Sequence, residues 1–151
     1  MDVNYINPFI AATVNLFKTM LAIDIKPGKP HLKAVPHPTF DVSGIIGLSG
    51  SAQGSIGISF PKVLALKVVS KMLGQEIKVV GPDLTDGIGE LANIVAGNAK
   101  QDLSQYQLSI SLPNVIVGKD HLIAGQSGIP TIVVPFTCTL GEFVMEVSLK
   151  T

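Results

Sequence analysis

The sequence predicts an α+β fold in which antiparallel β-hairpins pack against three main helices. Two segments alternate apolar with small or polar residues, a period of two that is typical of β-strands, whereas three others carry apolar residues at helical spacing. These segments do not follow one another as strand, helix and strand in regular succession, which argues against a doubly wound parallel sheet. A length of 151 residues suits one compact core, so we expect a single domain over residues 1–151.

The N-terminal part of the chain predicts a helix followed by an extended connector. The helix spans about residues 8–24, and one side of it carries Phe9, Leu16, Phe17, Met20 and Ile23. Residues 27–38 then hold four of the ten prolines, which fix φ and lack an N–H donor. We therefore expect this connector to be stiff and to form no regular strand pairing.

The segment of residues 40–60 predicts a β-hairpin that turns at residues 50–54. Apolar side chains alternate with small ones on both sides of the turn, at Ile46 and Leu48 and again at Ile56, Ile58 and Phe60. Glycines at positions 44, 47, 54 and 57 lie in or beside these strands, where glycine weakens a strand unless another segment must come close. We expect a helix to pack closely on this sheet.

The remaining segments predict two helices and a second hairpin. One helix runs from Pro61 through Leu73, with Gly74 just past its end, and the longest helix covers about residues 84–104. Short strand candidates lie around residues 108–112, 115–117 and 121–124. Alternating apolar residues over 132–138 and 143–149 predict a closing hairpin that turns at Leu140 and Gly141.

Composition narrows the functional class. The chain is 46% hydrophobic and only 15% charged, which excludes intrinsic disorder, and its 11 basic residues are all lysines balanced by 11 acidic ones. Without arginine for bidentate contacts and without a basic excess, we do not expect a nucleic-acid binder. A chain with so few charged residues is expected to expose apolar surface, and pairing with a second copy is the commonest way to cover it. We therefore expect a homodimer.

The sequence also bears on location. It has no run of about 20 uninterrupted apolar residues, so we expect no membrane span. The first residues carry neither a basic stretch nor a small-residue cleavage site, and the single Cys138 cannot form an internal disulfide. Both features predict a cytoplasmic protein.

Most familiar catalytic and metal-binding motifs are absent. The sequence has no phosphate-binding loop, no glycine-rich dinucleotide motif and no Cys-x-x-Cys or His-Glu-x-x-His pattern. His31 and His37 in the proline-rich connector are interpreted as solvated rather than as metal ligands, and His121 as structural. Cys138 alternates with Phe136 on an apolar strand face, where a free cysteine acts as a small hydrophobic side chain.

The longest helix carries the most informative pattern. Its apolar face, which we expect in the core, consists of Leu84, Ile88, Leu91, Ala92, Val95, Ala96, Ala99 and Leu103. The opposite side carries Asp86, Glu90, Asn93, Gly97 and Gln101. Glu90 and Asn93 are three residues apart, so their side chains are neighbours on the outer surface, about 5–6 Å apart at Cβ.

Glycines in this helix need an explanation, because each destabilises a helix by roughly 1 kcal/mol relative to alanine. Gly87, Gly89 and Gly97 are interpreted as clearing the outer face of bulk, so that another protein can approach Glu90 and Asn93. An ordinary solvated polar face is the alternative, since exposed Glu and Asn are common. The residues alone do not decide between these two interpretations.

Residues 86–100, Asp-Gly-Ile-Gly-Glu-Leu-Ala-Asn-Ile-Val-Ala-Gly-Asn-Ala-Lys, carry a resemblance to a known family. This run resembles the Glu-x-x-Asn helix of the CheC/CheX/FliY phosphatases of chemotaxis. The likeness extends to four other segments: residues 7–10, the glycine-rich hairpin of residues 44–60, the Leu112–Pro113 step and the closing hairpin. The first helix has Asn15 but carries Ala12 in place of the acid, and one Glu-x-x-Asn helix per chain is the CheX arrangement.

The resemblance implies a CheC-like fold and dephosphorylation of a CheY-type response regulator, whose phosphoryl group sits on an aspartate beside Mg²⁺. It implies no cofactor of the chain's own, with the Mg²⁺ on the partner. Asn93 is expected to hold the attacking water and Glu90 to pair with the regulator's active-site lysine. Asp86 and Gly97 are expected to contact the partner, Gly97 by leaving room for it, and Asn98 to have a structural role.

Two alternatives remain at this stage. A chain with this fold and this helix could bind a response regulator without hydrolysing its phosphate, as a non-catalytic adaptor. The low charge content also allows a structural or small-ligand domain, which a deep apolar pocket away from the long helix would favour.

Overall fold

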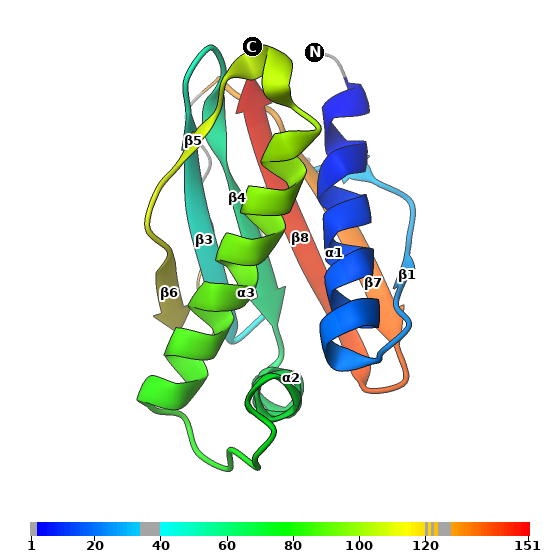
Figure 1. Cartoon of the computed structure of the whole chain (residues 1–151), viewed down its shortest axis with the longest axis vertical. Coiled ribbons are helices and arrows are strands. Elements are labelled where there is room, and N and C mark those ends of the chain that lie inside the picture. Colours follow the sequence, from blue (N-terminus) through cyan, green and yellow to red (C-terminus); the bar gives the residue numbers. More distant parts are fainter. Residues whose placement is uncertain (1–2, 34–39, 120, 122, 124–127) are drawn as a thin grey trace.

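One antiparallel sheet forms the centre of the structure, a computed structural model that describes residues 3–33, 40–119, 121, 123 and 128–151 (Figure 1). Within these residues the strands are β1 (Lys26–Pro27), β2 (His31–Leu32), β3 (Val42–Ser49), β4 (Gln53–Phe60), β5 (Ser109–Ile110), β6 (Asn114–Val117), β7 (Thr131–Cys138) and β8 (Gly141–Lys150). Their order across the sheet is β1-β7-β8-β4-β3-β5, with β2 also paired to β7 and β6 to β3.

Both predicted hairpins are confirmed, and a third pairing joins them. β3 pairs with β4 and β7 with β8, each through its short turn. β4 then pairs with β8, so that Ile56 lies opposite Val147 and Ile58 opposite Met145. Because alternate side chains of a strand share a face, these four residues are buried on one side of the sheet.

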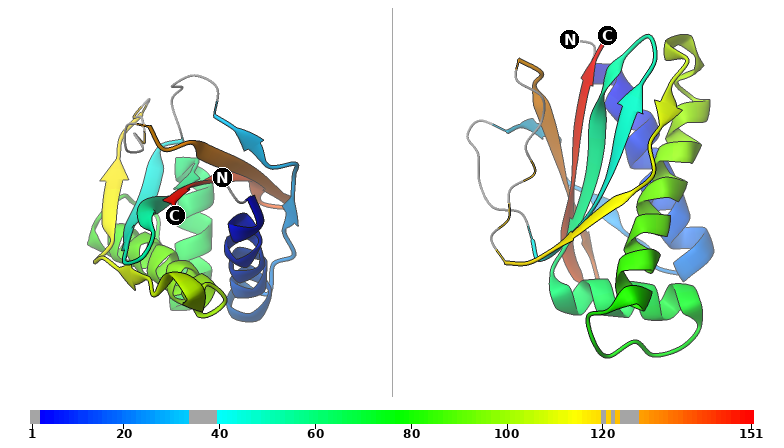
Figure 2. Two further views of the ribbon diagram at one scale, coloured as in Figure 1. Left: turned by 90° about the horizontal axis from the view of Figure 1, so that it is seen from above. Right: turned by 90° about the vertical axis from the view of Figure 1, so that its left-hand side faces the viewer.

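Two long helices cover that side of the sheet. α1 (Ile6–Leu21), preceded by the 3₁₀ turn η1 (Val3–Tyr5), lies beside α3 (Pro82–Gln101), which the 3₁₀ turn η2 (Ser104–Tyr106) follows (Figure 1, Figure 2). α2 (Lys62–Leu73) lies across one end of the sheet and ends where Gly74 adopts a left-handed φ of 67°. The α+β class with three main helices is therefore confirmed. No helix in the described part of the chain is long and apolar enough to cross a membrane.

Four phenylalanines tie these layers together. The ring of Phe143 in β8 stacks on three others, those of Phe17 in α1, Phe60 in β4 and Phe136 in β7, at centroid distances of 4.8–5.0 Å. All four rings are fully buried. Ring contacts at this distance add to the free energy gained by burying the apolar surface. The cluster thus joins α1 to strands from both hairpins.

The expectation that the proline-rich connector forms no regular pairing is wrong for the described residues. β1 and β2 both pair with β7, at the edge of the sheet. The N–H of Gly28 donates to the Pro135 oxygen and that of Lys33 to the Thr131 oxygen. These two residues supply backbone donors to β7 that the prolines of the connector lack. Proline is tolerated at such an edge because one side of the strand has no neighbour to bond. Residues 34–38 of the connector lie outside the described residues.

The close packing of a helix expected at the strand glycines occurs at one of them. A Cβ at Gly44 would lie 3.1 Å from Ile88 and 3.2 Å from Ala92, because α3 packs directly on β3. Gly54 instead faces the backbone of β8, and Gly57 faces Ile123 on the other side of the sheet. Helix packing therefore explains Gly44, whereas other neighbours explain the glycines of β4.

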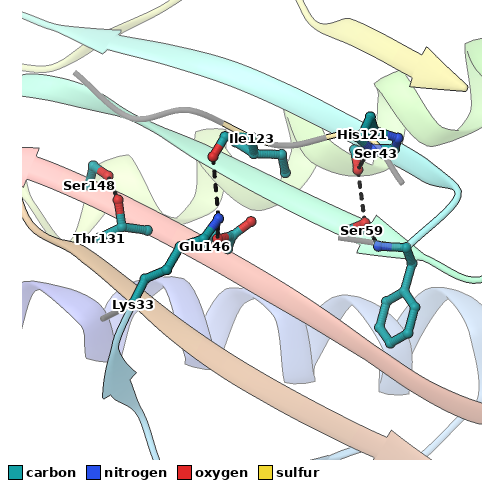
Figure 3. A network of polar contacts seen from close by, with 9 residues as sticks. Lys33, Ser43, Ser59, His121, Ile123, Thr131, Glu146 and Ser148 are labelled. Atoms are coloured by element: carbon teal, nitrogen blue, oxygen red, sulfur yellow. Dashed lines mark hydrogen bonds and ion pairs between the residues drawn. The ribbon is translucent and has the colours of Figure 1, made fainter. Parts of the chain in front are cut away.

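The face of the sheet away from α1 and α3 carries a polar network (Figure 3). Lys33 Nζ lies 2.6 Å from Glu146 Oε1 on β8 and donates to the Ile123 carbonyl oxygen at 3.3 Å. The Ser43 hydroxyl lies 2.8 Å from that of Ser59 on the neighbouring strand. Alternation along the strands places these polar groups opposite the apolar side chains that face the helices. Of the strand candidate at residues 121–124, only His121 and Ile123 are described, and neither belongs to a strand.

Candidate active site

The outward strip of α3 lies where the sequence predicts it. Asp86 and Glu90 are exposed, and Asn93 and Gly97 are half-buried. All eight residues of the predicted apolar face are buried, which confirms the orientation of the helix. The structure therefore brings Glu90 and Asn93 together on the side of α3 that faces away from the sheet, and no helix or strand lies in front of this side in Figure 1.

Local sequence features set the start of α3 and thereby the direction of each side chain. Gly81 caps the helix, Pro82 occupies the first position, where a missing N–H has no consequence, and Asp83 lies in the first turn. A carboxylate there favours the positive end of the helix dipole. Buried residues such as Leu84 and Val95 then hold the helix in the core. Positions 86, 90, 93 and 97 consequently share the outer surface.

The polar side chains on this strip are available to another molecule. Asp86, Glu90 and Asn93 make no hydrogen bond or ion pair with any residue that the structure describes. The carboxylates can accept hydrogen bonds or pair with a cation, and the Asn93 carboxamide can both donate and accept. This combination can orient a water molecule and bind a positive group at the same time.

Of the three helix glycines, the structure places only Gly97 on the outer face. A Cβ at Gly97 would meet nothing within 4 Å, so this position does leave the outer face clear. Gly87 and Gly89 are buried instead. A Cβ at Gly87 would lie 2.6 Å from Val69 of α2, and one at Gly89 would lie 3.3 Å from the Pro113 ring. These two glycines let α2 and the segment before β6 approach α3.

A groove lies beside the strip and was not predicted from the sequence. It is lined by Thr85, Asp86, Gly89, Glu90, Pro113 and Val115. One wall therefore comes from α3 and carries both carboxylates, and the other comes from Pro113, just before β6, and Val115, within β6. The signal for it in the sequence is a glycine at position 89 inside a helix, which indicates a close neighbour without saying which one.

The structure describes three of the four remaining candidate residues, namely His31, His121 and Cys138. The part of the chain that is described contains no group of three or more His, Cys, Asp or Glu able to hold a metal ion, and His37 lies outside it. His31 is exposed, as expected. His121 is structural, since its ring nitrogens lie 2.7 Å from the Gly118 oxygen and 2.6 Å from Ser43 Oγ. Cys138 is half-buried rather than fully buried, and its thiol donates to the Gly141 oxygen.

Two asparagines outside the pair differ from it in their surroundings. Asn98 is exposed and makes no hydrogen bond to a described residue, so the structural role expected for it finds no support. Asn15 of α1 is also exposed, and Ala12, at the position of the missing acid, is buried. Only α3 therefore presents both members of a Glu-x-x-Asn pair.

An apolar hollow lies away from α3, between the start of α1 and the β1–β2 edge, with Ile6, Pro30, Leu32 and Ile132 among its lining residues. Pro30 and Leu32 are themselves exposed, so the hollow is a surface feature rather than a deep pocket. It is therefore not the deep apolar pocket that would favour a small-ligand domain.

Comparisons with known proteins identify the family of the chain. The family model for the chemotaxis phosphatase CheX matches residues 42–137, a range that includes all of α3. The chain belongs to the CheX family. The CheY-P phosphatase CheX of Thermotoga maritima is 34% identical over 127 residues, which cover 80% of this chain and 79% of that protein. The resemblance inferred from residues 86–100 is thereby confirmed at the level of the family.

Solved structures extend the match to the whole CheX-family fold. A CheC-like superfamily protein from Shewanella sp. PV-4 is 39% identical and superposes with a TM-score of 0.91 over 100% of both chains. The CheX protein in a CheX–CheY–BeF₃–Mg²⁺ complex from Borrelia burgdorferi is 30% identical, with a TM-score of 0.84 over 99% of this chain and 100% of that one. The expected CheC-like fold is therefore confirmed.

Proposed function

We propose that this chain hydrolyses the aspartyl phosphate of a CheY-type response regulator. The observation that carries the proposal is the position of Glu90 and Asn93 on the outward side of a well-anchored helix in a CheX-family chain. Neither side chain makes a hydrogen bond or ion pair with a described residue. The relative from Thermotoga maritima is named a CheY-P phosphatase, and the Borrelia burgdorferi relative is held in a complex with CheY. Both names support the substrate class.

In the proposed reaction, Asn93 holds the attacking water. Phosphoryl transfer passes through a loose transition state, so catalysis depends on an in-line nucleophile and on charge stabilisation more than on covalent chemistry by the enzyme. A neutral carboxamide can accept a hydrogen bond from the water and donate another without repelling the anionic phosphoryl group. A short side chain on a rigid helix also loses little entropy when it is fixed, which favours positioning.

Glu90 is proposed to pair with a lysine of the regulator and so to orient the complex. A carboxylate that becomes desolvated against a cation forms a strong and directional contact. Asp86 extends the negative surface in the same groove, and Gly97 leaves the helix surface open to the partner.

The reaction is proposed to need no metal of the chain's own and to use the Mg²⁺ of the regulator. The strip of α3 offers a carboxylate pair and a carboxamide but no third acidic, histidine or cysteine ligand within the described residues. Such a surface suits insertion beside a metal already bound to the partner.

The test is to mix the chain with each phosphorylated response regulator of its own genome and to measure phosphate loss. Faster loss from at least one regulator is the expected result. Binding without faster loss would instead favour the adaptor, the second candidate function. If the chain neither binds a regulator nor speeds the loss of its phosphate, both functions are contradicted.

Glu90→Gln is expected to weaken binding of the regulator by about tenfold or more, since hydrogen bonds to charged groups contribute about 1.5–3 kcal/mol. The effect should appear in KM for the phosphorylated regulator and in the Kd, with kcat changed less. Glu142→Gln is the matched control, because Glu142 is an exposed carboxylate of β8 outside the α3 groove. Equal Kd values for the two variants would contradict the orienting role.

We further propose a homodimer. With only 15% charged residues, the chain exposes large apolar side chains such as Val63 and Val79, and pairing is the commonest way to cover such surface. Sedimentation at micromolar concentration should give twice the mass of one chain, and a monomer at every concentration would contradict the proposal.

A cytoplasmic location is proposed as well, since the lone Cys138 gives no internal disulfide that requires an oxidising compartment.

A further inference from the structure

An exposed apolar surface lies beside the catalytic strip proposed above. We call three residues the apolar rim: Leu112 and Pro113, just before β6, and Val115, within β6. Leu112 is 88% exposed, more than any other large apolar side chain in the described part of the chain. Isolated exposed leucines are common and need no explanation. This one differs because of how its backbone is held and what lies next to it.

The backbone at Leu112 is fixed by hydrogen bonds to the sheet. The Ser111 N–H donates to the Gly47 oxygen at 2.9 Å, and Ser111 Oγ accepts from the Gly47 N–H at 2.8 Å. The same hydroxyl donates to the Leu112 carbonyl oxygen at 2.9 Å. Pro113 has a fixed φ of its own and also restricts the backbone of the residue before it, which is Leu112. Leu112 thus projects from an ordered segment, and little entropy is lost when a partner binds it.

Two residues of the rim, Pro113 and Val115, lie against α3 beside Glu90. The Pro113 ring and the Val115 side chain lie 3.3 and 3.4 Å from the Cβ position of Gly89, so they are in contact with the helix there. Together with Asp86 and Glu90 they line one groove, with carboxylates on one wall and apolar side chains on the other. A molecule that pairs with Glu90 must therefore pass close to the rim.

We propose that the apolar rim binds the response regulator next to its phosphorylated aspartate, while Glu90 and Asn93 enter the phosphorylation site. The inference rests on the proposed function and names the surface of the partner by its chemistry: a cation flanked by apolar side chains. Such a surface complements the groove because its cation meets Asp86 and Glu90 while its apolar part covers Leu112 and Pro113. Apolar contacts around an ion pair exclude water and strengthen it.

The test compares Leu112→Ala with Leu32→Ala. Leu32 is a matched control, since it is 60% exposed and lies on β2, at the opposite edge of the sheet. The probe is the CheY-type regulator of the same genome held in its activated state by BeF₃ and Mg²⁺, so that binding is measured without hydrolysis. For Leu112→Ala we expect the Kd to rise about tenfold and KM to rise with it, at unchanged kcat and unchanged unfolding midpoint. Leu32→Ala should leave all four quantities as in the wild type.

Equal Kd values for Leu112→Ala and the wild type would overturn the proposed binding role of the rim and leave the proposed function standing. A changed sedimentation coefficient of Leu112→Ala with an unchanged Kd for the regulator would also overturn it, because Leu112 would then contact a second copy of the chain. If the wild-type chain binds none of the activated regulators of its genome, the proposed function fails and the rim fails with it.

Discussion

Replacing Asn93 by alanine is expected to reduce stimulated dephosphorylation of the regulator by roughly 100-fold or more, while the Kd for the regulator changes little. The carboxamide is the group proposed to orient the attacking water, and alanine offers no hydrogen bond to replace it. Because the Asn93 side chain makes no hydrogen bond or ion pair with a described residue, the change removes no polar contact from the fold. The measurement is single-turnover phosphate loss at saturating phosphatase.

Asn98→Ala is the control for this prediction. Asn98 lies on the same helix and is exposed and unpaired among the described residues, but it lies outside the strip formed by positions 86, 90, 93 and 97. Its loss should leave the rate unchanged. Asn93→Asp is nearly isosteric and should nevertheless be as inactive as alanine, because a carboxylate repels the phosphoryl group. A variant at position 93 that retains the wild-type rate would reject the catalytic role.

Replacing Lys33 by methionine is expected to lower the free energy of unfolding by about 3–5 kcal/mol. Lys33 and Glu146 have side chains only 9% and 2% exposed, and their charged atoms lie 2.6 Å apart (Figure 3). Neither Glu146 oxygen accepts a hydrogen bond from another group in the described part of the structure. Removal of the ammonium therefore leaves a buried carboxylate without a counter-charge, and urea unfolding at neutral pH measures the loss.

The double variant Lys33→Met with Glu146→Met separates the loss of the pair from the burial of one charge. Two apolar side chains of similar length should restore most of the stability, because the pair itself contributes little beyond the desolvation it offsets. Lys29→Met, at an exposed lysine of the same connector, should have almost no effect. A double variant as unstable as Lys33→Met alone would contradict this account of the pair.

Much of the secondary structure follows from local patterns. The alternation around Ile56 and in the closing hairpin predicts strands whose apolar face is buried, and the spacing from Leu84 to Leu103 predicts the buried face of α3. Local patterns also misled at two places. The prolines predict no pairing at residues 27–33, yet this segment pairs with β7, because an edge strand needs donors from only some of its residues. The spacing of Gly87 and Gly89 suggests an outer face, yet both are buried.

By itself, the amino-acid sequence determined the α+β class, the three helices, the two hairpins and the outward position of Glu90 and Asn93, because periodicity and capping act within one element. Tertiary structure alone decided that β4 pairs with β8, that Pro113 and Val115 form a wall of the groove beside Glu90, and that Lys33 meets Glu146. Those contacts join residues far apart in the chain, and their free energy depends on how whole elements pack. No local pattern carries that information.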